Sequence, residues 1–364
     1  MRRMVAGLQM RRMVARLQTK RSLPYPPGSL PMLPEFQNMV DTMDKELSLD
    51  SAHFQLTGRC NLACVFCGQN KGMLASEVCE LPVELWLKLA EEIKTMSPRT
   101  PELMLWGGEP LLYPGFDDLA AELHKRGFKL GMVTNATLLH EHLDAVAENI
   151  DSINISVDGT RTGHDAMRGN GVFDKLSANL KLLNPRRKGK LTFLTTVSDL
   201  NVKGISQLPF ELAKLGCDEI VLQPLMYLTG EEIASYRSYS CQNWQKDYPE
   251  LAAWQREEDA AYLTELRKEL ETVQKTAYPL PVRFTPHRYP SMEECPPCRA
   301  PWHRVHIRHD GEVGFCTDYF GFSAGNVQKN TLREIFYGER AALYRKAVED
   351  NALTTCDHCP WRLQ

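Results

Sequence analysis

The sequence has 364 residues, enough for about two domains, and its 43% hydrophobic and 24% charged content is typical of a globular protein, which excludes a largely disordered or fibrous chain. Seven of its 43 basic residues and none of its 46 acidic residues lie in the first 34 positions, so the rest of the chain is acidic. We therefore expect no nucleic-acid partner. No apolar run approaches the roughly 18 residues of a transmembrane helix, so we expect no membrane partner.

The chain begins with a nine-residue repeat, MRRMVAGLQ followed by MRRMVARLQ, and a Pro-rich stretch covers 23–34. A misassigned translation start or a disordered tail explains the repeat better than a transit peptide, because transit peptides are also rich in Ser. We predict that residues 1–50 form a basic leader and a linker.

From residue 51 onward, short apolar runs alternate with amphipathic helical patterns. The predicted strands are 53–57, 102–106, 129–134, 152–158, 191–197 and 219–224, and the predicted helices are 82–96, 116–126, 141–149, 173–183 and 205–215. Strands that alternate with helices indicate parallel βα units. Six units are too few for a closed eight-stranded barrel, so we predict an α/β fold with a partial (βα)6 TIM-like barrel over 51–228. Functional residues should then lie at the carboxyl ends of the strands.

A second, smaller module is expected after the barrel. The pattern over 249–276 predicts one long helix within a helical linker or cap, 229–290. The remaining residues, 291–364, predict a cysteine-rich α+β module that contains a hairpin around Asp310 and Gly311 and a helix opened by a capping box of Thr331 and Glu334.

The chain has eleven cysteines, and this odd number argues against a complete extracellular disulfide framework. Their clusters at both ends of the fold indicate metal binding in a reducing, cytoplasmic compartment. Cys60, Cys64 and Cys67 follow the first strand in a CxxxCxxC pattern. Three thiolates can hold a four-iron four-sulfur (4Fe-4S) cluster with one iron left open. A structural zinc site, the alternative, requires a fourth ligand that this segment lacks.

The CxxxCxxC spacing, together with the Gly-Gly-Glu-Pro sequence at 107–110, resembles the radical S-adenosylmethionine (radical SAM) enzymes. The resemblance implies that the open iron binds S-adenosylmethionine (SAM). One electron from the cluster then cleaves SAM to a 5'-deoxyadenosyl radical, which abstracts hydrogen from a substrate. It also implies a reducing electron donor of the flavodoxin or ferredoxin type.

The same resemblance assigns cofactor contacts near the first two strands. Gly107 and Gly108 allow close backbone approach, and Glu109 would accept from the amino group of SAM. Phe66, just before the third cysteine, would lie against the adenine; core packing is the alternative for this ring.

Further contacts are expected at the ends of later strands. Ser156, in a Ser-Val-Asp-Gly sequence, would contact the ribose, and Arg168 would pair with the SAM carboxylate, a role suited to its planar two-donor edge. A solvated arginine is the alternative for Arg168. Asn135 and Gln223 end the third and sixth strands, which we expect to open into the same mouth.

The second cysteine set resembles the SPASM domain of radical SAM enzymes, and more closely its shortened Twitch form. A full SPASM pattern has seven cysteines, so the five present imply one auxiliary 4Fe-4S cluster. The expected ligands are Cys298, Cys316, Cys356 and Cys359, with Cys295 as a spare or exchangeable ligand. Two CxxC pairs, 295–298 and 356–359, would also suit a structural zinc ion, and this alternative stays open.

Other polar residues of the second module carry weaker signals. Asp318, two residues after Cys316, is a candidate general base by resemblance to related maturases, in which the aspartate directly follows the corresponding cysteine. His303, His306 and His309 recur at every third position, so they cannot all share one face of a strand, and we expect them on the surface.

The sequence therefore predicts a radical SAM oxidoreductase that abstracts hydrogen and then oxidises or cross-links its substrate, with epimerisation also open. A small alcohol or sugar is favoured as substrate, or else a peptide, because the 50 residues before the first strand show no leader-binding pattern. A peptide or protein maturase or epimerase of the same superfamily is the alternative. An iron-sulfur electron carrier or a zinc-stapled interaction protein is the alternative of another class. Such a protein would have no use for 107–109 or Arg168.

Overall fold

The computed structural model describes residues 47–68, 79–285, 298–317 and 322–359. The predictions for the leader over 1–46, for the spare ligand Cys295 and for the general base Asp318 fall outside these ranges. None of the helices within them is long and apolar enough to cross a membrane.

A single ten-stranded sheet organises the described chain, in the order β10-β9-β8-β1-β2-β3-β4-β5-β6-β7. All pairs from β8 through β1 to β7 are parallel, and β9 and β10 add an antiparallel edge beside β8. The strands are β1 Ser51–Thr57, β2 Glu102–Gly107, β3 Lys129–Thr134, β4 Ser152–Ser156, β5 Lys190–Val197, β6 Glu219–Pro224, β7 Val282–Phe284, β8 Arg304–Ile307, β9 Glu312–Gly314 and β10 Gly325–Asn326. The order does not close on itself, so the predicted partial barrel is confirmed.

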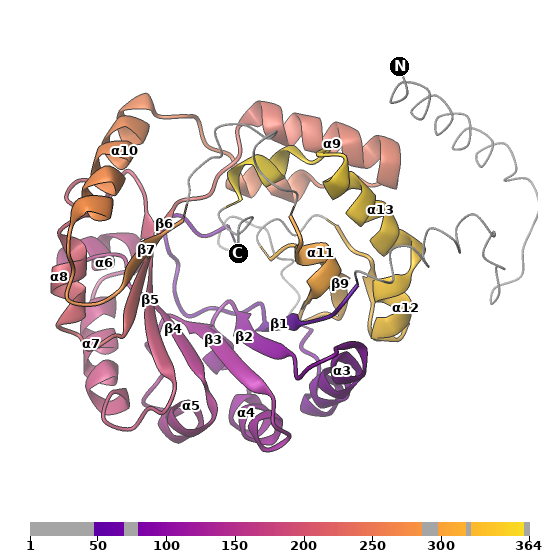
Figure 1. The fold of residues 1–364 in the computed structure, drawn as a ribbon, viewed down its shortest axis with the longest axis horizontal. Helices are drawn as coiled ribbons and strands as arrows, with labels where there is room; N and C mark the ends of the chain where they lie inside the picture. Colours follow the sequence, from indigo (N-terminus) through magenta and orange to yellow (C-terminus); the bar gives the residue numbers. More distant parts are fainter. Residues whose placement is uncertain (1–46, 69–78, 286–297, 318–321, 360–364) are drawn as a thin grey trace, which may run out of the picture. The chain divides into compact units, whose positions relative to one another are not determined.

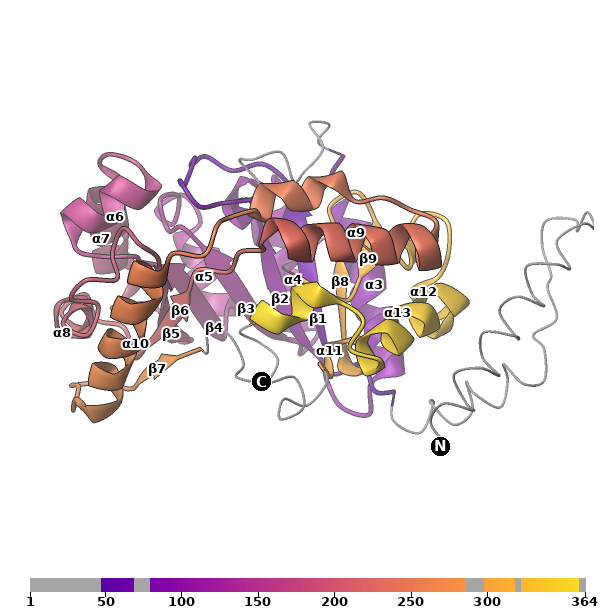
Figure 2. The same cartoon turned by 90° about the horizontal axis from the view of Figure 1, so that it is seen from above.

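Helices cover the convex side of this curved sheet, as Figure 1 shows for α3, α4, α5 and α7. The helices and 3-10 turns are α3 Val83–Met96, η2 Pro110–Leu112, α4 Phe116–Lys125, α5 Leu143–Asn149, α6 Arg161–Arg168, α7 Val172–Leu183, α8 Leu208–Ala213, α9 Gly230–Trp244, η3 Pro249–Trp254, α10 Ala260–Lys275, α11 Ala300–His303, α12 Leu332–Tyr337, α13 Glu339–Glu349 and η4 Thr354–His358. In Figure 2, α6, α7, α8 and α10 gather at one end of the molecule and α9, α12 and α13 at the other.

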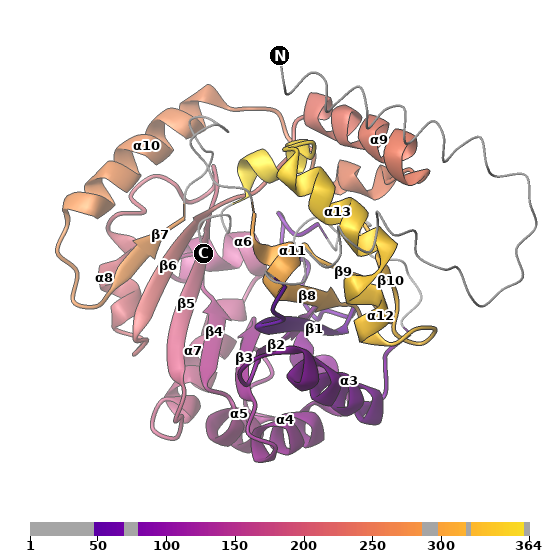
Figure 3. The ribbon, with the colours of Figure 1, turned by 45° about the vertical axis from the view of Figure 1, so that its right-hand side comes forward.

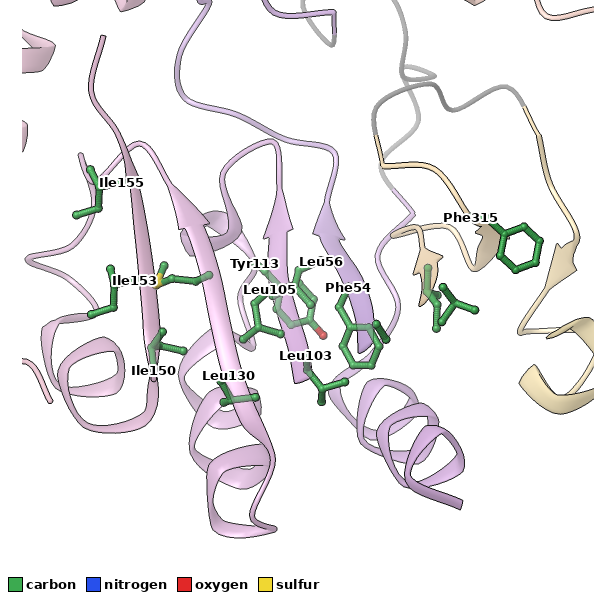
Figure 4. Packing of buried hydrophobic residues seen from close by; sticks show 14 of the residues in the cluster. Phe54, Leu56, Leu103, Leu105, Tyr113, Leu130, Ile150, Ile153, Ile155 and Phe315 are labelled. Carbon is green, nitrogen blue, oxygen red and sulfur yellow. The ribbon is translucent and has the colours of Figure 1, made fainter. Parts of the chain in front are cut away.

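The core lies between the strands and the outer helices because side chains alternate along each strand. Phe54, Leu103 and Leu105 are fully buried, and Figure 4 shows them among the packed side chains of β1 and β2. The ring centroid of Phe54 lies 4.8 Å from that of Trp86 on α3. The intervening positions, such as Met104, face the concave side. One set of strand positions thus builds the core, and the other is left for the site.

The predicted single helix over 249–276 is wrong. The segment is divided into η3 and α10, and Asp259 begins α10 by accepting from the backbone N–H groups of Ala261 and Tyr262. Helix α9 was not predicted, although Thr229 and Glu232 form a capping box at its start. The capping box predicted at Thr331 and Glu334 is confirmed at α12.

The C-terminal module continues the barrel sheet. The predicted hairpin is present as β8 and β9. Strand β8 also pairs in parallel with β1, from Ser51 opposite Arg304 to Phe54 opposite Ile307. Figure 3 shows β8 beside β1, at the edge away from β7. The module and the barrel therefore share one sheet, while the predicted boundaries at 229 and 291 stay predictions.

Candidate active site

A cavity of about 660 Å³ occupies the concave side of the sheet. Its lining comes from the inward positions of β1 to β8 and from the loops at their carboxyl ends, where the parallel-sheet rule predicts function. Seven of the eight predicted cofactor contacts line it: Phe66, Gly107, Gly108, Asn135, Ser156, Arg168 and Gln223.

The cysteine loop follows the carboxyl end of β1. Its three cysteines, Cys60, Cys64 and Cys67, all line the cavity. Two asparagines tie the loop to the end of β3. The side-chain Nδ2 of Asn135 donates to Asn61 Oδ1 at 2.9 Å, and Asn61 Nδ2 donates to Thr137 Oγ1 at 2.8 Å. The loop is therefore held by polar contacts to a neighbouring strand.

The two glycines after β2 are required by a close backbone approach. A Cβ atom on Gly108 would lie 2.1 Å from the carbonyl oxygen of Arg59, and one on Gly107 would lie 2.4 Å from that of Thr57. The backbone N–H of Gly108 donates to Thr57 at 3.0 Å. The glycines thus seat β2 against the start of the cysteine loop, and they also line the cavity.

Glu109 is fully buried and does not line the cavity. Its carboxylate accepts from Thr134 Oγ1 at 2.7 Å, from the Asn135 N–H at 2.8 Å and from the Leu111 N–H at 3.3 Å. Burial raises its pKa to about 7. In this structure Glu109 joins the ends of β2 and β3, and its contact with a SAM ammonium stays a prediction.

Arg168 lines the cavity and is only 9% exposed, which removes the solvated alternative. Its Nε donates to Asp158 Oδ2 at 2.5 Å, and its Nη1 lies 3.8 Å from Cys64 Sγ. The guanidinium carbon lies 5.4 Å from the centroid of the Phe66 ring. Arg168 thus links the cysteine loop, the predicted adenine contact and β4.

Asp158 is a site residue that sequence reasoning missed. It is fully buried, and its other oxygen accepts from the Thr196 N–H at 2.8 Å. Its own N–H donates to His164 Nδ1 at 3.2 Å. The Ser-Val-Asp-Gly sequence was the available signal, but only its serine was assigned a role.

Gln223 and Ser156 complete the cavity wall at the ends of β6 and β4. Within the described ranges, Gln223 Nε2 is buried without a hydrogen-bond partner, which leaves a donor for a ligand. The Asn135 side chain is already engaged, because its Oδ1 accepts from Thr137.

The second cysteine set belongs to the C-terminal module. Cys298, Cys316 and Cys356 are half-buried and pack against the core. The pKa of the Tyr344 hydroxyl is raised well above its usual value. Burial is the largest cause, and the Cys316 and Cys356 thiols near this ring are the next two. The Cys359 N–H donates to the Cys356 carbonyl at 3.3 Å. Cys316 and Cys356 thus lie near the same ring, and the binding of one cluster by all four cysteines stays a prediction.

Sequence comparison now identifies both regions. Residues 54–205 match the radical SAM superfamily, and residues 298–360 match SPASM, an iron-sulfur cluster-binding domain. The chain is a radical SAM protein with a SPASM domain. These matches give its cofactors: S-adenosylmethionine, a 4Fe-4S cluster and auxiliary iron-sulfur binding.

Two relatives align with this radical SAM protein over most of both chains. The tungsten-containing aldehyde ferredoxin oxidoreductase cofactor-modifying protein of Pyrococcus furiosus is 26% identical over 85% of this chain and 87% of its own. The AdoMet-dependent heme synthase of Methanosarcina barkeri is 28% identical over 85% and 88%. The crystal structure of Streptococcus suis SuiB bound to its precursor peptide SuiA has a similar fold, with a TM-score of 0.62 at 15% identity over 98% of this chain and 83% of that one.

The donor set of the radical SAM region fits its cluster. Burial raises the pKa of Cys60 to about 11 and also raises that of Cys64, so bound iron would be needed to hold these thiols as thiolates. Across the described ranges, no three Cys, His, Asp or Glu side chains converge on a single-ion position. Three thiols that border one cavity can each bind one iron of a cluster.

The surface prediction for the SPASM histidines is wrong for two of them. His306 is 1% exposed and its Nδ1 lies 3.2 Å from the Cys316 carbonyl, to which it donates. His309 is 3% exposed and its Nδ1 donates to the Cys79 carbonyl at 2.9 Å. His303 is half-buried. His306 lies on β8, which pairs with β1 inside the sheet, and His309 follows this strand and packs beside Gly58 and Cys79. A separate module would leave both side chains exposed.

Proposed function

We propose that this protein is an enzyme that binds SAM at the carboxyl end of the barrel, abstracts hydrogen from a substrate in the cavity and completes a two-electron oxidation with one auxiliary cluster. One observation carries the proposal: Cys60, Cys64 and Cys67 line the cavity, and Thr317, the residue directly after the proposed auxiliary ligand Cys316, lines it as well.

Chain residues divide the work between binding and positioning. Arg168, anchored by Asp158, keeps donors on the cavity side for a carboxylate, and Gln223 and Ser156 offer hydrogen bonds to a polar ligand. Cys298, Cys316, Cys356 and Cys359 are the proposed auxiliary ligands. When bound, SAM and the clusters supply a 5'-deoxyadenosyl radical for hydrogen abstraction and an acceptor for one electron.

The comparisons favour a different substrate class from the alcohol, sugar or peptide expected from the sequence. The heme synthase relative aligns over 85% of this chain. We therefore propose a tetrapyrrole as substrate, with a flavodoxin- or ferredoxin-type protein as electron donor.

The test is anaerobic turnover of the reconstituted protein with SAM and reduced flavodoxin, followed by assay of 5'-deoxyadenosine. The wild type should cleave SAM, and the triple variant Cys60→Ala/Cys64→Ala/Cys67→Ala should not, because it cannot hold the cluster. Absence of cleavage by a wild-type protein that has its full iron content would overturn the enzyme proposal in favour of an electron carrier.

A further inference from the structure

The cavity has a second, charged end at the amino-terminal edge of the sheet. Each strand from β8 through β7 contributes its first inward-facing position there. We call this ring of residues the N-terminal rim: Arg304, Ser51, Glu102, Lys129, Ser152, Lys190, Glu219 and Arg283. The strand register places Arg304, Ser51, Glu102 and Lys129 side by side, and it pairs Ser152 with Lys190. Ion pairs join Glu219 to Lys190 and to Arg283. All of the rim residues except Ser51 and Lys129 line the cavity. A ligand that enters from this end therefore meets the rim.

The N-terminal rim carries more positive than negative charge, with four basic and two acidic residues. Glu219 is almost fully buried and is shared by Lys190, at 2.6 Å, and Arg283, at 2.5 Å. These three groups together keep one positive charge. Lys190 and Arg283 are each more than half exposed, so both still present donors to a ligand.

Arg304 is the basic group best placed to bind an anion. Its Nε donates to Ser51 Oγ at 3.0 Å, which holds the guanidinium at the cavity wall. Among the residues that the structure describes, no carboxylate lies within ion-pair distance of Arg304. A planar guanidinium with a free edge suits a carboxylate because it can donate two parallel hydrogen bonds.

The walls above the rim differ in chemistry. Met104 and Trp106 on β2, with Leu194 on β5 and Val221 on β6, give the cavity an apolar surface. Asn154 on β4 and Thr192 on β5 add amide and hydroxyl groups. Trp106 is backed by His306, with ring centroids 5.0 Å apart. An apolar wall that leads from a positive rim fits a flat apolar molecule with carboxylates on its edge.

We propose that the N-terminal rim, with Arg304 as the principal anchor, binds carboxylates of a tetrapyrrole substrate whose reacting edge enters the cavity. This inference rests on the proposed function and names the groups that would recognise its substrate. The cavity must also hold SAM at its other end, so a large ring system would enter by one edge and leave its remaining carboxylates at the rim.

The test is equilibrium binding of coproporphyrin III to the reconstituted holoenzyme with SAM. Arg304→Gln should weaken binding by about 10- to 100-fold, the loss expected for a charged hydrogen bond. Arg267→Gln is the matched control, because Arg267 lies exposed on the outer helix α10, and it should leave the dissociation constant unchanged. The tetramethyl ester of coproporphyrin III should bind the wild type more weakly than the acid and should be insensitive to Arg304→Gln.

An unchanged dissociation constant in Arg304→Gln, equal binding of acid and ester, or no porphyrin binding by the wild type would each overturn the rim proposal. Iron content and circular dichroism check that the variant folds. If Arg304→Gln does not fold, Arg283→Gln, at a more exposed rim position, gives the same comparison with the same expected direction. SAM cleavage without porphyrin is measured in parallel: its absence in the wild type refutes the proposed function, whereas its presence beside unchanged binding refutes the rim alone.

Discussion

The two cysteine regions differ in the contacts that surround them. The loop of Cys60, Cys64 and Cys67 is held by hydrogen bonds and charges, through Asn61, Asn135 and the buried Arg168–Asp158 pair. The second set packs against rings: the Trp244 centroid lies 4.7 Å from that of Phe322, which in turn lies 4.8 Å from that of Tyr344. Polar contacts around an open cavity suit a site that exchanges SAM, and a close-packed aromatic shell suits a permanently held group.

The largest expected effect separates the two regions by metal content. Two thiolate-held 4Fe-4S clusters imply about eight irons per chain. The double variant Cys356→Ala/Cys359→Ala should lose about four of them and should make no final product, because the substrate radical would have no electron acceptor. Its first cluster should still produce 5'-deoxyadenosine. Stoichiometric zinc with about four irons in fully active native protein would instead support the zinc alternative.

A second prediction concerns the polar region alone. Arg168→Lys keeps the charge but loses the planar donor edge, so the dissociation constant for SAM should rise by about 10- to 100-fold, or about 1.5–3 kcal/mol. Calorimetric titration of SAM into holoprotein measures this change. Arg161→Lys, on the exposed face of the same helix α6, is the control and should bind SAM normally. Equal affinities in both variants would argue against a SAM contact at Arg168.

A third prediction uses pH. Burial lowers the pKa of His164 to about 4 from its usual 6.5, because the imidazole is fully enclosed beside Arg168. The unfolded chain therefore binds a proton at higher pH than the folded chain. The neutral histidine contributes stability that is present above pH 6.5 and is lost as the pH falls toward 4. From pH 7 to pH 5, the free energy of unfolding of the wild type should fall by about 2 kcal/mol more than that of His164→Gln.

Urea unfolding of both proteins at the two pH values measures this difference. His140→Gln, which changes an exposed histidine after β3, should behave like the wild type. Parallel pH dependence in the wild type and in His164→Gln would mean that His164 titrates normally.

The smallest effect tests the second region away from its cysteines. Thr331 caps α12 by accepting from the Glu334 N–H at 3.2 Å. Thr331→Ala should lower the free energy of unfolding by about 1 kcal/mol and leave the iron content unchanged, whereas Thr331→Ser should retain most of the stability. Loss of iron in Thr331→Ala would show that the auxiliary site depends on helix α12.

The sequence predicted the parts of this protein that depend on local spacing. CxxxCxxC, the glycine pair and Arg168 were found because their residue types and intervals are visible in the chain. Asn61 acts through a partner 74 positions away, so no short pattern reveals it. Asp158 stands in the Ser-Val-Asp-Gly sequence, but its pairing with Arg168, 10 positions away, is not visible in that pattern. His306 and His309 were misplaced for a related reason, since their burial depends on segments more than 200 positions away: β1 for His306, and Gly58 and Cys79 for His309.

Strand pairing between β1 and β8 also has a consequence for synthesis. Ser51 and Arg304 are 253 positions apart, yet they are neighbours in the sheet. At roughly 5–20 residues per second, β1 would wait roughly 10–50 s on the ribosome before its partner is made. During that interval the edge of β1 has unpaired backbone groups that favour association with other chains. We therefore expect nascent chains that end before residue 304 to aggregate or to engage chaperones, and full-length chains to be released from them.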